Sequence, residues 1–434
     1  MAEVSKITGE VRIPGETLLK LAKKITNAAE FRKEIESSLS SETTEVFSAI
    51  LTGALNLGAS DIHIEPEENG AKIRARLDGI LQDITGIETK IYSPLLSRVK
   101  LLSGLKLNIS ARPQDGRFSV SSENSLVEIR SSILPSQYGE SMVLRILNPK
   151  NIIGLEELGL RPDLLATLKK EIKKPNGMII ATGPTGSGKT TTLYAFLALV
   201  QKPEIKIITI EDPIEYHLKG ISQTQVDAQK GYDFASGLKS IMRQDPDVIL
   251  VGEIRDLETA NIALQAALTG HLVFSTLHTN DASGAVARLQ SLGEKAMNIA
   301  PAVSLIVAQR LARKVCQKCA KFEKAGPQIT KKIKTALGNI KKSVKVPLIG
   351  KNAKLPMAIG CKNCNFTGYR GRVGIFEALL IDDELENLIL KSPSIAALKK
   401  AAIKKGMVTI YQDGVIKALE GITTLEEVER VVGE

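Results

Sequence analysis

The stretch GPTGSGKT, from Gly183 to Thr190, decides how this chain folds. It follows a short apolar run, Met178 to Ala181, that predicts a buried strand, and it precedes a segment from Thr191 that predicts the first turns of a helix. This order of strand, glycine-rich loop and helix is the setting that the phosphate-binding pattern G-x-x-x-x-G-K-[ST] needs, and an incidental glycine-rich turn would not supply it. Loop amides and the positive end of the helix would hold phosphate oxygens, Lys189 would reach the β- and γ-phosphates, and Thr190 would bind Mg²⁺. The stretch therefore predicts a nucleoside triphosphate site made of Gly183, Pro184, Thr185, Gly186, Ser187, Gly188, Lys189, Thr190 and Thr191.

Three apolar runs that follow this loop predict further strands of the same sheet, with helical segments between them. They cover residues 205–210, 248–251 and 272–277. A residue with an ionisable side chain follows the end of each run, namely Glu211, Glu253 and His278. Because ligands bind at the edge where the carboxyl ends of parallel strands meet, we expect these three side chains to cluster near Lys189.

The same residues fit the hydrolysis of a triphosphate, which requires neutralised phosphates and an oriented nucleophile. An ordinary Walker B strand ends in an aspartate that helps to hold Mg²⁺, but here Gly252 takes that place and Glu253 follows. Glu253 is therefore expected to orient or deprotonate the attacking water, with Glu211 as a second carboxylate near the metal. His278 is expected to donate to the γ-phosphate, whereas His271 fits a structural histidine equally well.

The chain before this core predicts a small α+β domain over residues 43–148, because short alternating strands surround two helical segments. Three of its strand-like runs carry an arginine, at Arg117, Arg130 and Arg145. Two interpretations stay open from the residues alone. The arginines are either paired with acidic side chains in the sheet or face a phosphate group.

All four cysteines of the chain occur as two C-x2-C pairs, Cys316, Cys319, Cys361 and Cys364. Two such pairs are typical of a structural zinc site, in which thiolates occupy the corners of a tetrahedron. The spacer between the pairs is longer than in an ordinary zinc ribbon, and buried thiols or a redox pair are the alternatives. The sequence thus predicts Zn²⁺ at these cysteines.

The formal net charge of +10 is concentrated in one segment of the 434 residues. Residues 311–354 hold 13 Lys and Arg against one acid, so the rest of the chain is close to neutral. A solvated basic face explains this segment, with anionic lipid headgroups as a second interpretation, and it lacks the interleaved aromatic residues that would stack on bases. The sequence has neither a run of about 20 apolar residues nor a secretory signal, so we expect a cytoplasmic protein whose membrane contact is indirect.

Several longer motifs resemble one family. They are GASDIHIEP, QDGRFS, GPTGSGKTTTLYAFL, ITIEDPIEYH, RQDPDVILVGEIRD, HLVFSTLHTNDA, AQRLARKVC and GYRGRVGIFE. Over residues 43–434 the chain resembles the secretion ATPases of type II secretion and type IV pilus assembly (GspE/PilB-like). The resemblance implies that Glu211 and Glu215 lie in an Asp box, that Glu253 is the Walker B glutamate, and that His271 and His278 lie in a His box.

Further implications of the resemblance concern the arginines and cysteines. Arg130 and Arg145 match the arginines that the N-terminal domain of the family offers to the nucleotide, and Arg117 lies in a matching motif nearby. The cysteines match the zinc motif of the extension and secretion members, which retraction motors generally lack.

The resemblance also implies an α/β fold with a RecA-like P-loop core, an N-terminal α+β (PAS-like) domain and a zinc-binding insertion. The expected divisions are a short N-terminal arm at 1–42, the α+β domain at 43–148, a linker at 149–162, the core at 163–310, the tetracysteine subdomain at 311–373 and a helical subdomain at 374–434. The arm is too short for the additional domain that many relatives carry.

The implied function is a homohexameric, Mg²⁺-dependent ATPase at the inner membrane. It would act on a platform protein to power type IV pilus extension or pseudopilus assembly in type II secretion, with no nucleic-acid partner expected. Two alternatives are a RecA-like nucleic-acid motor and a nucleotide-gated scaffold with negligible turnover.

Overall fold

The computed structural model describes residues 9–122, 125–149, 153–348 and 353–433, which form two compact units. The first contains the N-terminal part up to Asn151 together with the two cysteine segments, Cys316–Cys319 and Ile359–Arg370. The second contains Ile152–Val315, Ala320–Ala358 and Gly371–Glu434. No helix among the described residues has the length and apolar composition needed to cross a bilayer.

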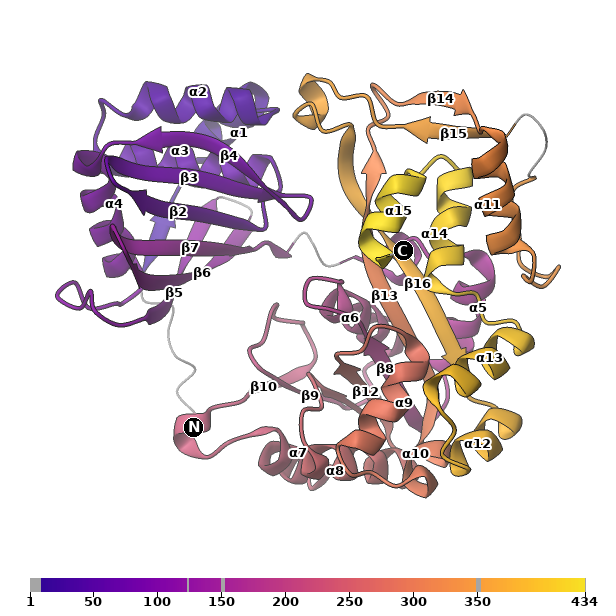
Figure 1. The fold of residues 1–434 in the computed structure, drawn as a ribbon. Coiled ribbons are helices and arrows are strands. Elements are labelled where there is room, and N and C mark those ends of the chain that lie inside the picture. The colour runs from indigo at the N-terminus through magenta and orange to yellow at the C-terminus, as the bar shows by residue number, and fades with distance from the viewer. Residues whose placement is uncertain (1–8, 123–124, 150–152, 349–352, 434) are drawn as a thin grey trace. The chain divides into compact units, whose positions relative to one another are not determined.

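A seven-stranded sheet in the order β1-β5-β6-β7-β2-β3-β4 forms the centre of the first unit (Figure 1). Its strands are β1 (Glu10–Arg12), β2 (Asp61–Glu67), β3 (Gly70–Leu77), β4 (Ile80–Ile87), β5 (Gln114–Ser122), β6 (Ser125–Ser136) and β7 (Gly139–Leu147). Apolar residues alternate along the strands, so that one face of the sheet packs against helices α1 (Gly15–Lys24), α2 (Ala28–Ser38), α3 (Thr43–Asn56) and α4 (Thr89–Leu102). Arginines lie between the apolar residues in sequence, and they therefore occupy the opposite face.

Residues 10–38, which lie within the arm predicted at 1–42, belong to this first unit. Strand β1 pairs in parallel with β5, and it buries Val11. Helix α2 buries Phe31 and Ile35, and the Phe31 ring lies so close to Gly53 of α3 that an added Cβ would be 2.1 Å away. The apolar residues of this segment therefore find their partners in the domain that follows, while residues 1–8 lie outside the described part.

The second unit is built on another seven-stranded sheet, in the order β10-β9-β11-β12-β8-β13-β16. Its strands are β8 (Gly177–Thr182), β9 (Ile207–Glu211), β10 (Ser222–Gln225), β11 (Val248–Val251), β12 (Leu272–Leu277), β13 (Val303–Val315) and β16 (Tyr369–Leu380). The pairs from β10 through β13 are all parallel. A parallel sheet buries both faces, and these strands accordingly read as continuous apolar runs.

Helices cover both faces of this sheet, so the core has three layers. One apolar cluster contains Ile180 and Ile249 with residues of α7 (Phe234–Met242), α8 (Leu257–Leu268), α9 (Ala282–Ser291) and α10 (Ala296–Ala302). The other contains Ile179 and Phe274 with residues of α5 (Pro162–Glu171) and α6 (Lys189–Val200). The predicted linker at 149–162 includes residues 150–152, which lie outside the described part, and a 3₁₀ turn, Leu155–Leu158, that buries two leucines in this second cluster.

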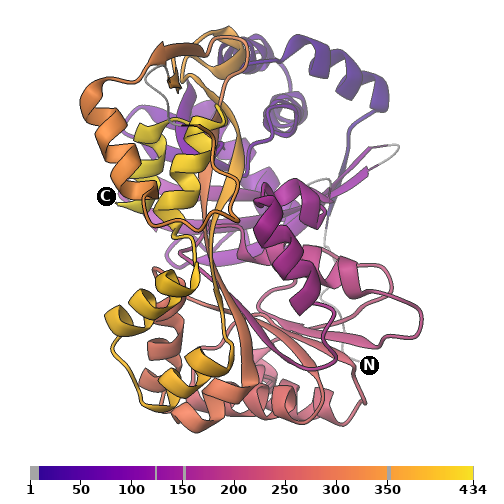
Figure 2. The same ribbon diagram turned by 90° about the vertical axis from the view of Figure 1, so that its right-hand side faces the viewer.

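Strands β13 and β16 run from the sheet to the helices α14 (Ile410–Leu419) and α15 (Leu425–Val432), as Figures 1 and 2 both show. Both strands cross the predicted limits of the tetracysteine subdomain at residues 311 and 373, because their apolar residues continue the core packing. The remaining α-helices and strands of the described residues are α11 (Pro327–Leu337), β14 (Lys321–Lys324), β15 (Lys354–Met357), α12 (Asp383–Leu390) and α13 (Ile395–Lys405).

Candidate nucleotide site and cysteine cluster

The phosphate-binding loop joins β8 to α6, as its sequence predicted. Gly183, Gly186 and Gly188 have φ angles of 150°, 79° and 88°, which residues with a Cβ atom rarely adopt. The loop also has no room at Gly183, where an added Cβ would lie 2.6 Å from the carbonyl oxygen of Gln309. The glycines therefore allow both the loop conformation and the close approach of β13.

Lys189 begins α6, and its ammonium group lies over the loop. The Nζ atom donates to the carbonyl oxygen of Gly183 at 2.8 Å and to that of Pro184 at 3.2 Å. Burial, opposed by the nearby Glu253 and reinforced by Arg310, lowers the pKa of Lys189 to about 8. The lysine thus lies within electrostatic reach of the glutamate that the sequence selected.

Glu253 and His278 lie beside each other at the carboxyl edge of the sheet. The distance from His278 Nε2 to Glu253 Oε2 is 3.8 Å, and Arg255 Nη2 lies 2.5 Å from the other carboxylate oxygen. Burial and the positive charge of Lys189 lower the pKa of His278, while Glu253 raises it. Lys189, Glu253 and His278 therefore form one interacting group, although they are distant in the sequence.

Neighbouring backbone and side chains fix the segment that carries Glu253. Thr276 Oγ1 donates to the carbonyl oxygen of Gly252 at 2.7 Å, and the amide of Ile254 donates to the carbonyl oxygen of Thr276 at 3.1 Å. A Cβ at Gly252 would lie 3.2 Å from the carbonyl oxygen of Ile210, so β9 leaves little space for the usual Walker B aspartate. Sequence reasoning missed the role of Thr276, which its position in an apolar strand did not reveal.

Glu211 ends β9 next to this segment, but its carboxylate is held by other protein groups. It accepts hydrogen bonds from Thr209 Oγ1 at 2.6 Å, from Gln223 Nε2 at 3.1 Å and from the hydroxyl of Tyr194. The side chain is buried, and these three groups are the hydrogen-bond donors to its carboxylate among the described residues. Glu211 thus shares the sheet edge with Glu253, while its carboxylate makes its own network.

His271 lies at the other end of β12 from His278. Its Nδ1 atom is 3.0 Å from the carbonyl oxygen of Ala266, and its own carbonyl accepts from Gly177. These bonds connect the end of α8 with the starts of β12 and β8, so the structure places only His278 of the two histidines with Lys189.

The three candidate arginines of the first unit lie side by side on one face of its sheet. Arg117 pairs with Arg130, and Arg130 pairs with Arg145 on the next strand. The row continues to Asp61 and Arg76. Acidic neighbours hold parts of the row, because Arg145 Nε lies 3.0 Å from Asp61 Oδ1 and Glu128 lies near both Arg117 and Arg130. Both interpretations of the arginines thus have a structural basis: they are paired with acids, and they form a row of positive charge.

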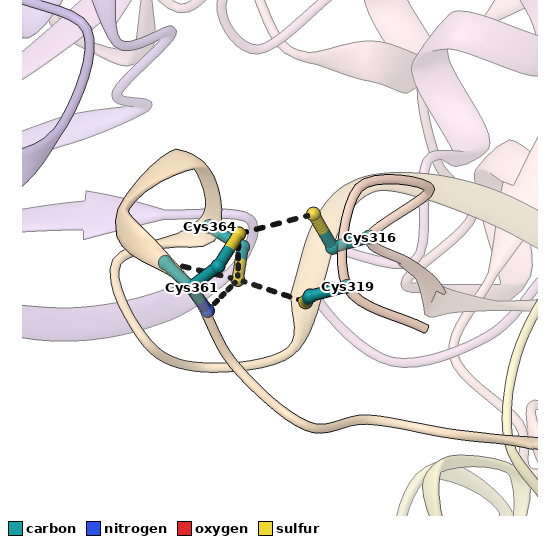
Figure 3. A group of neighbouring side chains, drawn as sticks. All are labelled: Cys316, Cys319, Cys361 and Cys364. Atoms are coloured by element: carbon teal, nitrogen blue, oxygen red, sulfur yellow. Dashed lines mark hydrogen bonds between the residues drawn. The ribbon is translucent and has the colours of Figure 1, made fainter. Parts of the chain in front are cut away.

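The four cysteines converge from two loops, as Figure 3 shows. Their sulfur atoms all lie within 4.8 Å of one another, and three of the separations are 3.8 or 3.9 Å. A tetrahedral ion with Zn–S bonds of about 2.3 Å would place its ligands roughly 3.8 Å apart. Backbone amides of Cys361 and Gly368 donate to Cys364 Sγ and fix its position. The cluster therefore fits a structural zinc ion, which would hold the two loops together.

Comparison with known proteins agrees with this arrangement. Residues 37–430 match the family model described as "Type II/IV secretion system protein". The chain belongs to this family. It is 45% identical over 402 residues to the type II secretion system ATPase E of Vibrio cholerae, covering 92% of this chain and 77% of that protein. It is 43% identical over 371 residues to the type IV pilus assembly ATPase PilB of Thermus thermophilus, covering 85% of this chain but only 41% of that protein. The resemblance stated from the motifs is confirmed, and the enzyme class that these relatives share is ATPase.

Solved structures confirm the fold class. The pilus retraction motor PilT with bound ADP matches with a TM-score of 0.59 and 28% identity, covering 88% of this chain and 95% of that one. The ATPase DotB of Legionella pneumophila matches with a TM-score of 0.63 at 22% identity, over 88% of this chain and 94% of that one. The second unit therefore has the expected RecA-like core, while the cysteine cluster fits the expected zinc-binding insertion.

Proposed function

We propose that this chain hydrolyses ATP at the site formed by the Gly183–Thr191 loop, Glu253 and His278. The observation that carries the proposal is the meeting of Lys189, Glu253 and His278 at the carboxyl edge of a parallel sheet. In such sheets ligands bind at this edge. The pilus motor structure that matches this chain was solved with ADP, which agrees with an adenine nucleotide.

Each residue then has a definite task. Lys189 and the loop amides bind the phosphates, and the Glu253 carboxylate orients the attacking water and accepts its proton. The lowered pKa of His278 favours its neutral form, which would offer a single N–H to the terminal phosphate. When bound, Mg²⁺ would neutralise phosphate charge, and the residues present that would hold it are Thr190 and Glu211, whose side-chain oxygens suit this ion. Glu211 would act from its hydrogen-bonded position as the second carboxylate.

The arginine row is proposed to supply positive charge to the nucleotide of this subunit or of a neighbour. Arg117, Arg130 and Arg145 would then act as fingers that stabilise the charge of the transition state. Head-to-tail contacts that close into a ring would give a homohexamer, in which such contributions between subunits are natural. Loss of the terminal phosphate would release the arginines and let the units move.

The biological role that fits best is a motor for type IV pilus extension or for pseudopilus assembly in type II secretion. The relatives named above belong to these two systems, and the tetracysteine cluster agrees with extension and secretion members. We propose a cytoplasmic position at the inner membrane, where the ATPase would act on a membrane-embedded platform protein and would have no nucleic-acid partner.

Steady-state phosphate release tests the enzymatic part of the proposal. Glu253→Gln should lower turnover at least about 100-fold while ADP still binds, because only the water-activating carboxylate is lost. Glu258→Gln is the matched control, since Glu258 is an exposed acid of α8 that pairs with Lys239. Equal and negligible turnover in the wild type and both variants would instead favour a nucleotide-gated scaffold.

Adding DNA or RNA to the same assay tests the alternative of a nucleic-acid motor. We expect no stimulation of turnover. Stimulation that falls steeply with salt would overturn the proposed role. Co-purification of a polytopic membrane protein with the wild-type chain is the expected result for a secretion or pilus motor.

A further inference from the structure

We propose that Gln309 is a positioning residue of the phosphate-binding loop, an inference that rests on the proposed nucleotide site. Gln309 lies on β13, and its side chain is only 2% exposed. Its Nε2 atom donates to the carbonyl oxygen of Ser187 at 2.8 Å. Ser187 is the residue that precedes Gly188 and Lys189 in the loop.

This hydrogen bond fixes the direction of one loop peptide. Because Gln309 holds the carbonyl of Ser187 toward β13, the amide at the other end of the same peptide, that of Gly188, must point the opposite way. Amides that point into the loop are what bind phosphate oxygens. Gln309 therefore acts on the ligand through the loop backbone.

Strand β13 supports this task at several points. It pairs with β8 up to Ala308 opposite Thr182, so the next residue, Gln309, falls beside the start of the loop. The backbone carbonyl oxygen of Gln309 approaches Gly183 so closely that a Cβ added at Gly183 would lie 2.6 Å from it. A Cβ added at Gly188 would lie 3.2 Å from the side-chain Nε2 atom of Gln309. The loop glycines are thus adapted to this strand as well as to phosphate.

The next residue of β13 connects the backbone at Gln309 with the segment after His278. Arg310 donates through Nη2 to the carbonyl oxygen of Asn280 at 2.8 Å and through Nη1 to that of Gln309 at 3.1 Å. Thr279 also contacts the end of β8, since its amide donates to Thr182 Oγ1 at 2.9 Å. Gln309 thus belongs to a small framework that holds the phosphate loop in a fixed position relative to the His278 segment.

The test compares Gln309→Met with Gln412→Met. Methionine keeps the length of the side chain and removes the amide. Gln412 is similarly buried, and its Nε2 donates to the carbonyl oxygen of Ala336 at 2.8 Å, but it joins α14 to α11 and lies on no element of the nucleotide site. It also bonds Asn339 and the amide of Thr409, so Gln412→Met should destabilise the apo protein at least as much as Gln309→Met.

Equilibrium binding of a fluorescent ADP analogue, together with the melting temperature of the apo protein, provides the readout. Gln309→Met should raise the Kd for ADP about tenfold, the effect of one lost hydrogen bond, and Gln412→Met should leave it unchanged. Gln309→Glu should weaken binding further than Gln309→Met, because its carboxylate cannot donate to the Ser187 carbonyl and adds negative charge beside the loop.

Each outcome has a definite meaning. An unchanged Kd in Gln309→Met, or an equal rise in Gln412→Met, would overturn the positioning role while leaving the nucleotide site intact. Lys189→Ala separates the two proposals, because it should abolish ADP binding if the site is correct. Full ADP binding by Lys189→Ala, or none by the wild type, would overturn the nucleotide site itself and the role of Gln309 with it.

Discussion

Replacement of Glu427 by glutamine should release helix α15 from the end of β13. The Glu427 side chain is fully buried and accepts hydrogen bonds from the amide, Nε and Nη2 of Arg313 at 3.0, 3.0 and 2.7 Å. Arg430 adds two more, at 2.7 and 2.6 Å. Glutamine keeps the shape of the side chain, but it removes the negative charge that both guanidinium groups contact.

The magnitude follows from the pKa of this carboxyl group. Burial opposes ionisation, but the bonds from Arg430 and Arg313 prevail and lower the pKa of Glu427 from 4.5 to about 2. At about 1.4 kcal/mol for each unit, the ionised form contributes about 3 kcal/mol above pH 4.5. Because the pKa is lowered on folding, this contribution is present at neutral pH and is lost as the pH falls from 4.5 toward 2.

Hydrogen exchange of the α15 amides measures this effect as the free energy of local opening. At pH 7 Glu427→Gln should speed exchange of these amides by about a hundredfold. The difference from the wild type should stay constant down to pH 5.5 and shrink by about 1.4 kcal/mol for each pH unit below 4.5. Glu429→Gln is the control, since Glu429 lies on the same helix and its carboxylate pairs with Lys332 at the surface, an interaction worth about 0–1 kcal/mol. Equal exchange in the two variants, or a difference that does not shrink at low pH, would refute this account of the anchor.

Three further predictions concern the two sites. Because the pKa of Lys189 is lowered to about 8, ADP binding near pH 8 should take up about half a proton and should weaken as the pH rises above 8. Lys189→Arg should bind ADP without this pH dependence, and calorimetry in two buffers measures the proton uptake of both proteins. A pH-independent Kd for ADP in the wild type would contradict the proximity of Lys189 to phosphate. Gly183→Ala should raise the Kd for ADP at least about tenfold, because its Cβ would lie 2.6 Å from the Gln309 carbonyl oxygen and its backbone would keep a φ of 150°. Gly326→Ala is the control and should bind ADP normally, since a Cβ added there meets no neighbour within 4 Å. Equal affinities of the two variants for ADP would argue against the close approach of β13. Cys361→Ser should lose roughly one equivalent of bound zinc per chain and should have a lower melting temperature. A strong chelator should remove the zinc from the wild type and lower its melting temperature in the same way. A variant with all four cysteines replaced and an unchanged zinc content would rule out the cluster as the metal site.

The parallel core could be predicted closely from the sequence. The expected runs at 248–251 and 272–277 coincide with β11 and β12, and the loop joins the expected strand and helix. These elements are local apolar runs, and the rule that parallel strands place their carboxyl ends together was enough to bring Glu253 and His278 to Lys189. The direction of the Glu211 carboxylate was beyond this reasoning, because Tyr194 and Gln223 determine it from other segments.

Features that depend on distant partners were predicted less well. Residues 10–38 show only a short amphipathic pattern in sequence, and their place in the first unit follows from partners such as Gly53 and β5. The bonds of Gln309 to Ser187 and of Glu427 to Arg313 likewise join residues more than a hundred positions apart. No local sequence pattern marks such contacts, because the hydrogen-bond partner of a buried amide or carboxylate is a distant group that only the tertiary fold brings close.

A crystal structure with Mg²⁺ and a non-hydrolysable ATP analogue tests the central claim most directly. We predict that the terminal phosphate lies against Lys189, with the Glu253 carboxylate and the His278 imidazole turned toward it. Bound nucleotide with Glu253 and His278 directed away from the terminal phosphate in every subunit would contradict the account.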